Sequence, residues 1–169
     1  MNTDTLARLA QRLADQLAAL HTRYEDGQLT RSEFVTTATA FLDAAAARAA
    51  ALADVALAAE VSRLRRQVAI PLGLAPTPVQ ESVVTEALDS PQYEQDGPGA
   101  VEVLARAVTL AAAQDATQNG MRQHEIKYWT RDPNAGACEV CEDLADGLVT
   151  VDQVMWTHKG CGCAQRPVA

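Results

Sequence analysis

Residues 138–163 read CEVCEDLADGLVTVDQVMWTHKGCGC and hold all four cysteines of this 169-residue chain. The pattern is C-x2-C, then sixteen residues, then H-x2-C-x-C. Two clusters of thiol and imidazole donors with such short internal spacing are typical of a structural zinc site, in which each turn supplies part of a tetrahedron. The five candidate metal ligands are Cys138, Cys141, His158, Cys161 and Cys163. The sequence therefore predicts a C-terminal module held together by structural Zn²⁺.

Four coordination positions have to be filled from these five donors. Alternate residues of an extended segment point the same way, so Cys161 and Cys163 can reach one ion together and leave His158 beside an all-thiolate site. In the other arrangement, His158 binds the ion with Cys138, Cys141 and only one of the last two cysteines. The spacing leaves both arrangements open.

Other chemistry for the cysteines has less support. A C-x2-C redox pair normally lies in a strand-to-helix turn of an α/β sheet, and no βαβ pattern precedes this pair. Disulfides need an oxidising compartment, whereas the first residues, MNTD, lack the basic and apolar regions of a signal peptide. We therefore expect a protein made in a cytoplasm, with reduced thiols that bind metal.

Composition limits the core and the kind of partner. Hydrophobic residues make up 48% of the chain but aromatic residues only 4%, and alanine is abundant, so the core side chains are mostly small. A net charge of −8 opposes binding to nucleic acid through a basic face. Arg63, Arg65 and Arg66 form a local basic cluster, but the negative end of a helix also explains them. No run of eighteen apolar residues is present, so we expect no membrane span.

The N-terminal part of the chain predicts a long antiparallel hairpin of two helices. Leucines recur every three or four positions over residues 4–26, which places them on one face of a helix. Thr30 and Glu33 have the spacing of a capping box at the start of a second helix, residues 31–69. Alanines in the middle of this helix indicate either close approach by another helix or simply high helix propensity.

The middle of the chain is expected to be less regular. Thr77 would cap a short helix ending near Leu88, followed by an exposed and mobile acidic loop around Tyr93. Asn119-Gly120 would end or kink a further helix over residues 99–125. The predicted parts are a helical hairpin (1–70), a Pro/Gly-rich linker with a short helix (71–98), a helix (99–126) and the zinc-binding module (127–169).

The predicted fold class is mainly α, with a small, zinc-stapled, β-rich module at the C-terminal end. Within that module we expect a strand at 126–131, a helical turn at 142–145 and extended segments at 148–151 and 154–157. Trp129 and Trp156 are expected to pack in its core. His21 and His124 are expected to be surface or helix-cap residues.

Further short segments accompany the cysteine clusters, namely Trp129-Thr130-Arg131 and Leu144-Ala145-Asp146-Gly147. With the helical body before them, these segments and the two cysteine clusters resemble the Mu F-like minor head (head morphogenesis) proteins of tailed bacteriophages, particularly the forms in phages of actinobacteria. About forty residues resemble the family closely, and the remainder only in helical character. The alanine- and arginine-rich, lysine-poor composition is also similar to that of proteins from high-GC genomes.

The resemblance implies a structural component of the virion head, present in few copies and acting in head assembly near the portal. The implied partners are the phage portal protein and the major capsid or scaffold proteins, with possible self-association through the helices. The protein would be made in the host cytoplasm and end in the virion head. Zinc would then be structural, because it fixes a module too small to fold on its own apolar area.

An enzymatic function is not expected from the sequence. No paired carboxylates, activated nucleophile or phosphate-binding glycine loop is present, and a zinc ion with four protein ligands has no open position for water. A zinc deaminase would need His-x-Glu before its cysteine pair, whereas His124 and Glu125 are adjacent. The alternative function is a zinc-ribbon-like adaptor or regulator that binds nucleic acid or protein.

Overall fold

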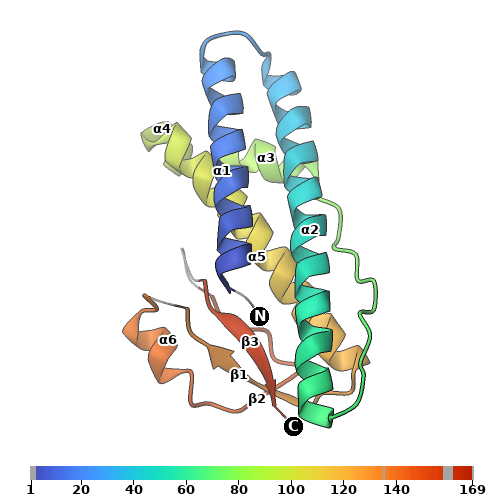
Figure 1. Ribbon diagram of the computed structural model, residues 1–169. Coiled ribbons are helices and arrows are strands. Elements are labelled where there is room, and N and C mark those ends of the chain that lie inside the picture. The colour runs from blue at the N-terminus through green and yellow to red at the C-terminus, as the bar shows by residue number, and fades with distance from the viewer. Residues whose placement is uncertain (1–2, 135, 158–161, 169) are drawn as a thin grey trace.

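The computed structural model describes residues 3–134, 136–157 and 162–168. Its elements in chain order are α1 (Thr3–Glu25), α2 (Arg31–Arg65), α3 (Glu81–Leu88), α4 (Pro91–Gln95), α5 (Gly97–Gln123), β1 (Tyr128–Asp132), α6 (Glu139–Asp143), β2 (Val149–Thr150) and β3 (Ala164–Val168). Three long helices form the body of the molecule, and a small sheet with α6 lies at one end of them (Figure 1). A mainly α fold with a small C-terminal sheet is therefore confirmed.

The helices α1 and α2 form the predicted hairpin, and the predicted capping box starts α2. Thr30 Oγ1 accepts a hydrogen bond from the Glu33 N–H at 3.2 Å, and Glu33 Oε2 accepts one from the Thr30 N–H at 2.8 Å. The backbone bond, followed by the bond from the Thr30 hydroxyl, holds the pKa of Glu33 below its usual value. A charged carboxylate is thus kept at the positive end of α2.

The helix α2 is shorter than the sequence predicts, because it ends at Arg65 instead of residue 69. Arg66 adopts a left-handed conformation with φ of 54°, which reverses the chain. The Ala69 N–H then donates to Ser62 Oγ at 2.9 Å and holds the returning chain against the helix. Val68, in the part of the predicted helix that lies beyond this end, is exposed.

Helix α5 crosses behind the hairpin and closes the core (Figure 1). At one end, leucine, valine and phenylalanine side chains of α1, α2, α3 and α5 form a continuous cluster. Beside it, Ala49, Ala50 and Ala53 of α2 face Ala113 and Ala116 of α5. Short side chains let two helix backbones approach closely. The alanines of α2 therefore serve close helix packing within this chain, which was one of the two interpretations of the sequence.

The same close approach explains why Asn119-Gly120 does not interrupt α5. The helix runs through this dipeptide to Gln123, so the predicted end or kink is wrong. A Cβ on Gly120 would lie 2.5 Å from Leu57 Cδ2 and 3.2 Å from Leu74 Cδ1. The glycine is thus needed for packing against α2 and the segment that follows it, and not for a turn.

Residues 66–80 run back along α2 in an extended conformation (Figure 1). The buried carboxylate of Asp54 on α2 accepts three hydrogen bonds from this segment, from the N–H groups of Leu72, Gly73 and Leu74 at 3.0, 2.7 and 3.3 Å. An extended segment outside a sheet has no strand partner for its N–H groups, and the Asp54 carboxylate accepts hydrogen bonds from three of them instead.

The helix that follows starts later than predicted. Gln80, and not Thr77, is the N-cap of α3, which begins at Glu81. Asp43 on α2 accepts a hydrogen bond from the Val79 N–H at 3.1 Å, so the chain around Pro78 is tied to α2 and stays extended. Tertiary hydrogen bonds outweigh the local capping preference at this point.

The acidic region around Tyr93 forms the short helix α4 and not the predicted loop, and Tyr93 packs against the core of the hairpin. His21 is buried, so its assignment as a surface or cap residue is also wrong. Its Nε2 lies 2.8 Å from Tyr93 Oη, which donates to Glu25 Oε1 at 3.2 Å. Burial, and then the nearby Glu25 carboxylate, raise the pKa of Tyr93 to about 12.

The other histidine that was expected at a helix end or on the surface, His124, is a helix cap as predicted, at the end of α5.

The sheet has the strand order β2-β1-β3 with antiparallel pairing throughout. Strand β1 is central and pairs with β3 from Tyr128 opposite Val168 to Asp132 opposite Ala164. The sequence analysis did not predict β3, because it contains Gln165, Arg166 and a proline, which are poor strand formers. As an edge strand, β3 tolerates the missing N–H of this proline.

The two tryptophans differ, although both were predicted to be in the core. Trp129 on β1 is 2% exposed and packs against residues of α2 and α5, as predicted. Trp156 is 54% exposed, so the prediction is wrong for this residue. In the extended segment around it, Met155 points inward, whereas Val154 and Trp156 point outward. Alternation along an extended chain therefore decides which of these side chains is buried.

Candidate metal centre

Three of the predicted ligands lie near one another in the structure. Cys138 is the exposed N-cap of α6, and Cys141, one turn later, is fully buried. Cys163 precedes β3 and packs with Cys141 and Ala137 in a small buried cluster. Two thiols therefore come from one turn, and a third comes from a segment more than twenty residues further along the chain.

The turn that carries the first pair is built by backbone hydrogen bonds. The N–H groups of Cys141 and Glu142 donate to the carbonyl of Cys138 at 2.9 and 3.0 Å. This single helical turn places residues three apart on the same side, as a C-x2-C donor pair requires. The donor types also fit zinc, since thiolates are soft ligands that tetrahedral zinc prefers.

The remaining candidates, His158 and Cys161, lie outside the described residues. Within the described ranges, no group of three or more His, Cys, Asp or Glu side chains forms a complete metal site. The described residues therefore bring together three of the predicted ligands, Cys138, Cys141 and Cys163, which both predicted ligand sets can include.

A buried arginine lies beside this cysteine cluster. Arg131 on β1 is 3% exposed, and its Nη1 lies 3.5 Å from Cys141 Sγ. Its Nη2 donates a short hydrogen bond to the carbonyl of Trp156. Directly across the sheet, Gln165 of β3 is also buried, and neither polar atom of its side chain has a hydrogen-bond partner among the described residues.

The other buried thiol has a polar neighbour as well. Cys163 Sγ lies 3.5 Å from Asn134 Oδ1, and Asn134 follows β1 by two residues. A Cβ on Gly162 would lie 3.2 Å from Asn134 Cγ, so the glycine lets this side chain pack against the backbone next to Cys163. Neither Arg131 nor Asn134 was expected as a site residue, because their proximity to sulfur depends on tertiary contacts that the spacing of the cysteines does not reveal.

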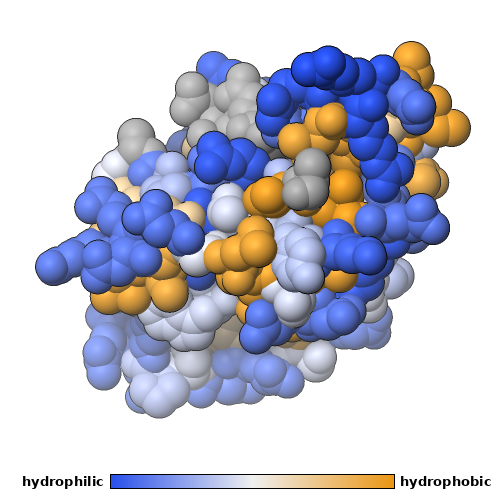
Figure 2. Space-filling model, turned by 90° about the horizontal axis from the view of Figure 1, so that it is seen from below, coloured by the Kyte–Doolittle hydropathy of each residue, from blue (hydrophilic) through white to orange (hydrophobic). Residues whose placement is uncertain are grey.

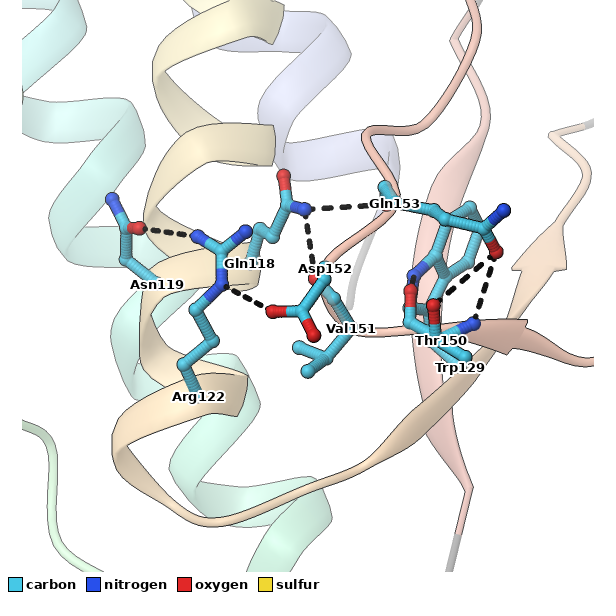
Figure 3. Close-up of polar contacts among 8 residues, drawn as sticks. All are labelled: Gln118, Asn119, Arg122, Trp129, Thr150, Val151, Asp152 and Gln153. Atoms are coloured by element: carbon cyan, nitrogen blue, oxygen red, sulfur yellow. Dashed lines mark hydrogen bonds and ion pairs between the residues drawn. The ribbon is translucent and has the colours of Figure 1, made fainter.

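Polar contacts fix the module to α5 (Figure 3). The Gln118 side chain donates to the carbonyls of Val151 and Gln153 at 2.8 and 3.2 Å, and Arg122 Nε lies 3.6 Å from an Asp152 carboxylate oxygen. Within the module, Trp129 Nε1 donates to the carbonyl of Thr150 at 3.1 Å. These contacts orient the loop after β2 on the helical body.

The segment that leads from the first cysteine pair to the second is acidic and partly apolar on its surface. Residues 136–157 contain five carboxylates and no lysine or arginine. Figure 2, which views this end of the molecule, shows hydrophobic side chains scattered among polar ones. The large exposed apolar side chains of the segment are Val140, Leu144, Leu148, Val154 and Trp156.

Comparison with known proteins found no matching family model, no matching curated protein and no matching solved structure. Among the helices that the structure describes, none is long and apolar enough to cross a membrane. The relation to phage head proteins therefore stays a prediction that rests on the residues of the C-terminal motif.

Proposed function

We propose that this protein is a structural minor head protein of a tailed phage that acts in head assembly near the portal, with a C-terminal module fastened by Zn²⁺. The observation that carries the proposal is the meeting of the two cysteine-bearing segments. Cys141 and Cys163 are packed together, with Cys138 one turn away, although the two segments are far apart in the sequence. These residues belong to the motif that resembles the Mu F-like proteins.

The ligands in this proposal are Cys138, Cys141 and Cys163, completed by Cys161 or His158. When bound, Zn²⁺ would link the turn at α6 to the start of β3 and so hold the module closed. The protein prepares this site by bringing the buried thiols of Cys141 and Cys163 together, with the exposed Cys138 one turn away. In this proposal the metal has a structural role and not a catalytic one.

The surface of the helical body supports contact with other head proteins. Phe41, Leu52 and Val55 are exposed on α2, and their spacing places them on one side of this helix. Exposed apolar side chains along one stripe are suited to helix packing against a portal, capsid or scaffold protein, or against a second copy. A virion component needs such surfaces, because its role is to hold partners together.

The alternative, a zinc-ribbon-like adaptor, is supported in its protein-binding form by the acidic segment, residues 136–157. This segment combines negative charge with exposed apolar side chains, which suits a protein partner and repels nucleic acid phosphates. An electrophoretic shift assay at low salt tests the nucleic-acid form, and we expect no retardation of DNA or RNA.

Mass spectrometry of purified phage particles, with quantification of copy number, tests the main proposal. We expect the protein in a few copies per particle, at or near the portal vertex in asymmetric reconstructions. Its absence from mature particles and from assembly intermediates would overturn the proposal.

A further inference from the structure

We propose that Arg131 and Asn134 donate hydrogen bonds to the metal-bound sulfurs of Cys141 and Cys163, and that Arg131 also offsets the negative charge of the site. This inference rests on the proposed zinc function and adds two positioning residues to it. Neither residue belongs to the cysteine and histidine pattern. Arg131 lies near the end of β1, and Asn134 follows this strand by two residues.

The position of Arg131 is the first support. A guanidinium is always charged, and burying it without compensation is costly. This one is almost completely buried and has an N–H donor 3.5 Å from Cys141 Sγ, within the range of hydrogen bonds to sulfur. Its second nitrogen is held by the Trp156 carbonyl. The hydrogen bond from Nη2 to the Trp156 carbonyl therefore orients the guanidinium so that Nη1 points towards the sulfur of Cys141.

The charge of the proposed site is the second support. A zinc ion with at least three thiolate ligands carries net negative charge, whichever of the two predicted ligand sets binds it. Cys141 and Cys163 are buried, so this charge would lie in a medium that solvates it poorly. A buried cation next to a buried anionic cluster offsets part of the cost of burying each charge.

Asn134 provides a similar contact to the other buried sulfur. Cys163 Sγ lies 3.5 Å from Asn134 Oδ1, the geometry of a thiol that donates to an amide oxygen. A metal-bound thiolate has no proton to donate. Rotation of the amide by half a turn would bring Nδ2 to the same place, and Asn134 would then donate to the sulfur. The Asn134 side chain packs closely against the backbone of Gly162, where a Cβ would lie 3.2 Å from Asn134 Cγ.

The sheet explains how Asn134 comes to lie beside Cys163 and where Arg131 lies relative to it. Pairing of β1 with β3 places Arg131 opposite Gln165, two residues after Cys163, and Asn134 follows directly beyond the paired strands. The cysteine at the start of β3 and Asn134 beyond the end of β1 are thus brought together by strand register. In this arrangement the sheet supplies the surroundings of the metal, and the turns supply its ligands.

Metal affinity measured on the full-length protein tests the inference. We would load the protein with Zn²⁺ alone, titrate it with a chromophoric chelator, and compare Arg131→Met, Arg131→Lys and Asn134→Leu with the unmodified chain. Loss of a partner that hydrogen-bonds a ligand typically weakens metal binding about 10- to 100-fold. We expect this loss for Arg131→Met and Asn134→Leu, and partial recovery for Arg131→Lys, which keeps the charge but not the fork.

A matched control and a spectroscopic readout separate this role from general packing. Arg166 lies on β3 opposite Thr130 and is exposed, so Arg166→Met removes the same charge from the same sheet and should leave affinity unchanged. With Co²⁺ in place of Zn²⁺, the sulfur-to-metal charge-transfer band of Arg131→Met should shift without losing the intensity that reports ligand number. Circular dichroism checks that each variant keeps its helix content.

Each outcome decides the matter. If the unmodified protein binds neither metal, both the proposed function and this inference fail. If it binds zinc and both Arg131→Met and Asn134→Leu bind equally well with an unchanged cobalt spectrum, only the inference fails. An equal loss of affinity in Arg166→Met would also overturn it, because the effect would then be one of overall charge.

Discussion

The helical body, residues 3–123, and the C-terminal module, residues 127–168, are stabilised by different interactions. In the body, apolar side chains of several helices form two continuous buried clusters. In the described part of the module, Trp129 and Met155 pack onto the ends of α2 and α5, and a second small cluster consists of Cys141 and Cys163 with the partly buried Ala137. The body therefore has a core of its own, whereas the large apolar side chains that the module buries lie against the body, and polar contacts hold the module in place.

This difference shows what a metal ion would contribute to the molecule. A segment of about forty residues with few large side chains buries too little apolar area to fold alone. The body has no such need, because its long helices share an extensive interface. A cross-link between the two cysteine segments is thus most valuable where the apolar core is smallest.

The largest expected effect is on the module alone. Removal of metal by a chelator, or Cys141→Ser, should abolish hydrogen-exchange protection of residues 127–168, because structural zinc contributes about 10–16 kcal/mol of apparent binding free energy in small modules. The parts of α1, α2 and α5 that form the two clusters of the body should stay protected, since these two clusters contain no module residue. Addition of Zn²⁺ after chelation should restore protection. Equal protection of the module with and without metal would remove the contrast between the two regions.

The reverse experiment weakens the body. Leu42→Ala should lower the free energy of unfolding by about 2–5 kcal/mol, because this side chain is completely buried in the larger cluster. Its neighbour Phe41 is 38% exposed, so Phe41→Ala is a matched control with a smaller expected loss. Urea unfolding followed by circular dichroism measures both. Similar losses in the two variants would mean that the packing described for α2 is wrong.

A smaller effect is expected for the polar contacts that hold residues 66–80. Asp54→Ala leaves three backbone N–H groups without their acceptor and should cost about 1–3 kcal/mol. Asp43→Ala removes the acceptor of a single N–H and should cost less. Thermal unfolding gives the ranking, and hydrogen exchange at Leu72 and Leu74 locates the change. An unchanged exchange rate there would show that the carboxylate does not hold the segment.

The smallest expected effect is a pH dependence of the body. The pKa of Tyr93 is raised from 10.0 to about 12 in the folded protein, so the unfolded chain loses this proton first as the pH rises. The stabilisation is complete below about pH 10 and is lost as the pH rises towards 12. Tyr93→Phe should flatten the stability profile in this window, and ultraviolet titration should lose its most alkaline tyrosine. Metal affinity of the module at neutral pH should not differ between the two proteins.

The sequence predicted the elements that depend on local patterns. Leucine spacing in α1, the capping box at Thr30 and the alanine face of α2 all report interactions within one helix or along one face. The errors occur where distant residues meet. Gly120 lies inside a helix, because Leu57 packs where a side chain at this position would be. Tyr93 lies in a helix and contacts His21. Strand β3 forms by pairing with β1.

For the candidate site, spacing alone identified the thiols Cys138, Cys141 and Cys163 as members of one group, because donors that share an ion must occur in short clusters along the chain. Tertiary structure alone decided that Cys141 lies beside Arg131 and Cys163 beside Asn134. The contact of Cys163 depends on the pairing of β1 with β3, which brings the end of one strand to the start of the other. The spacing of residues along the chain identifies the metal ligands, whereas the charges and hydrogen bonds around each ligand depend on the tertiary structure.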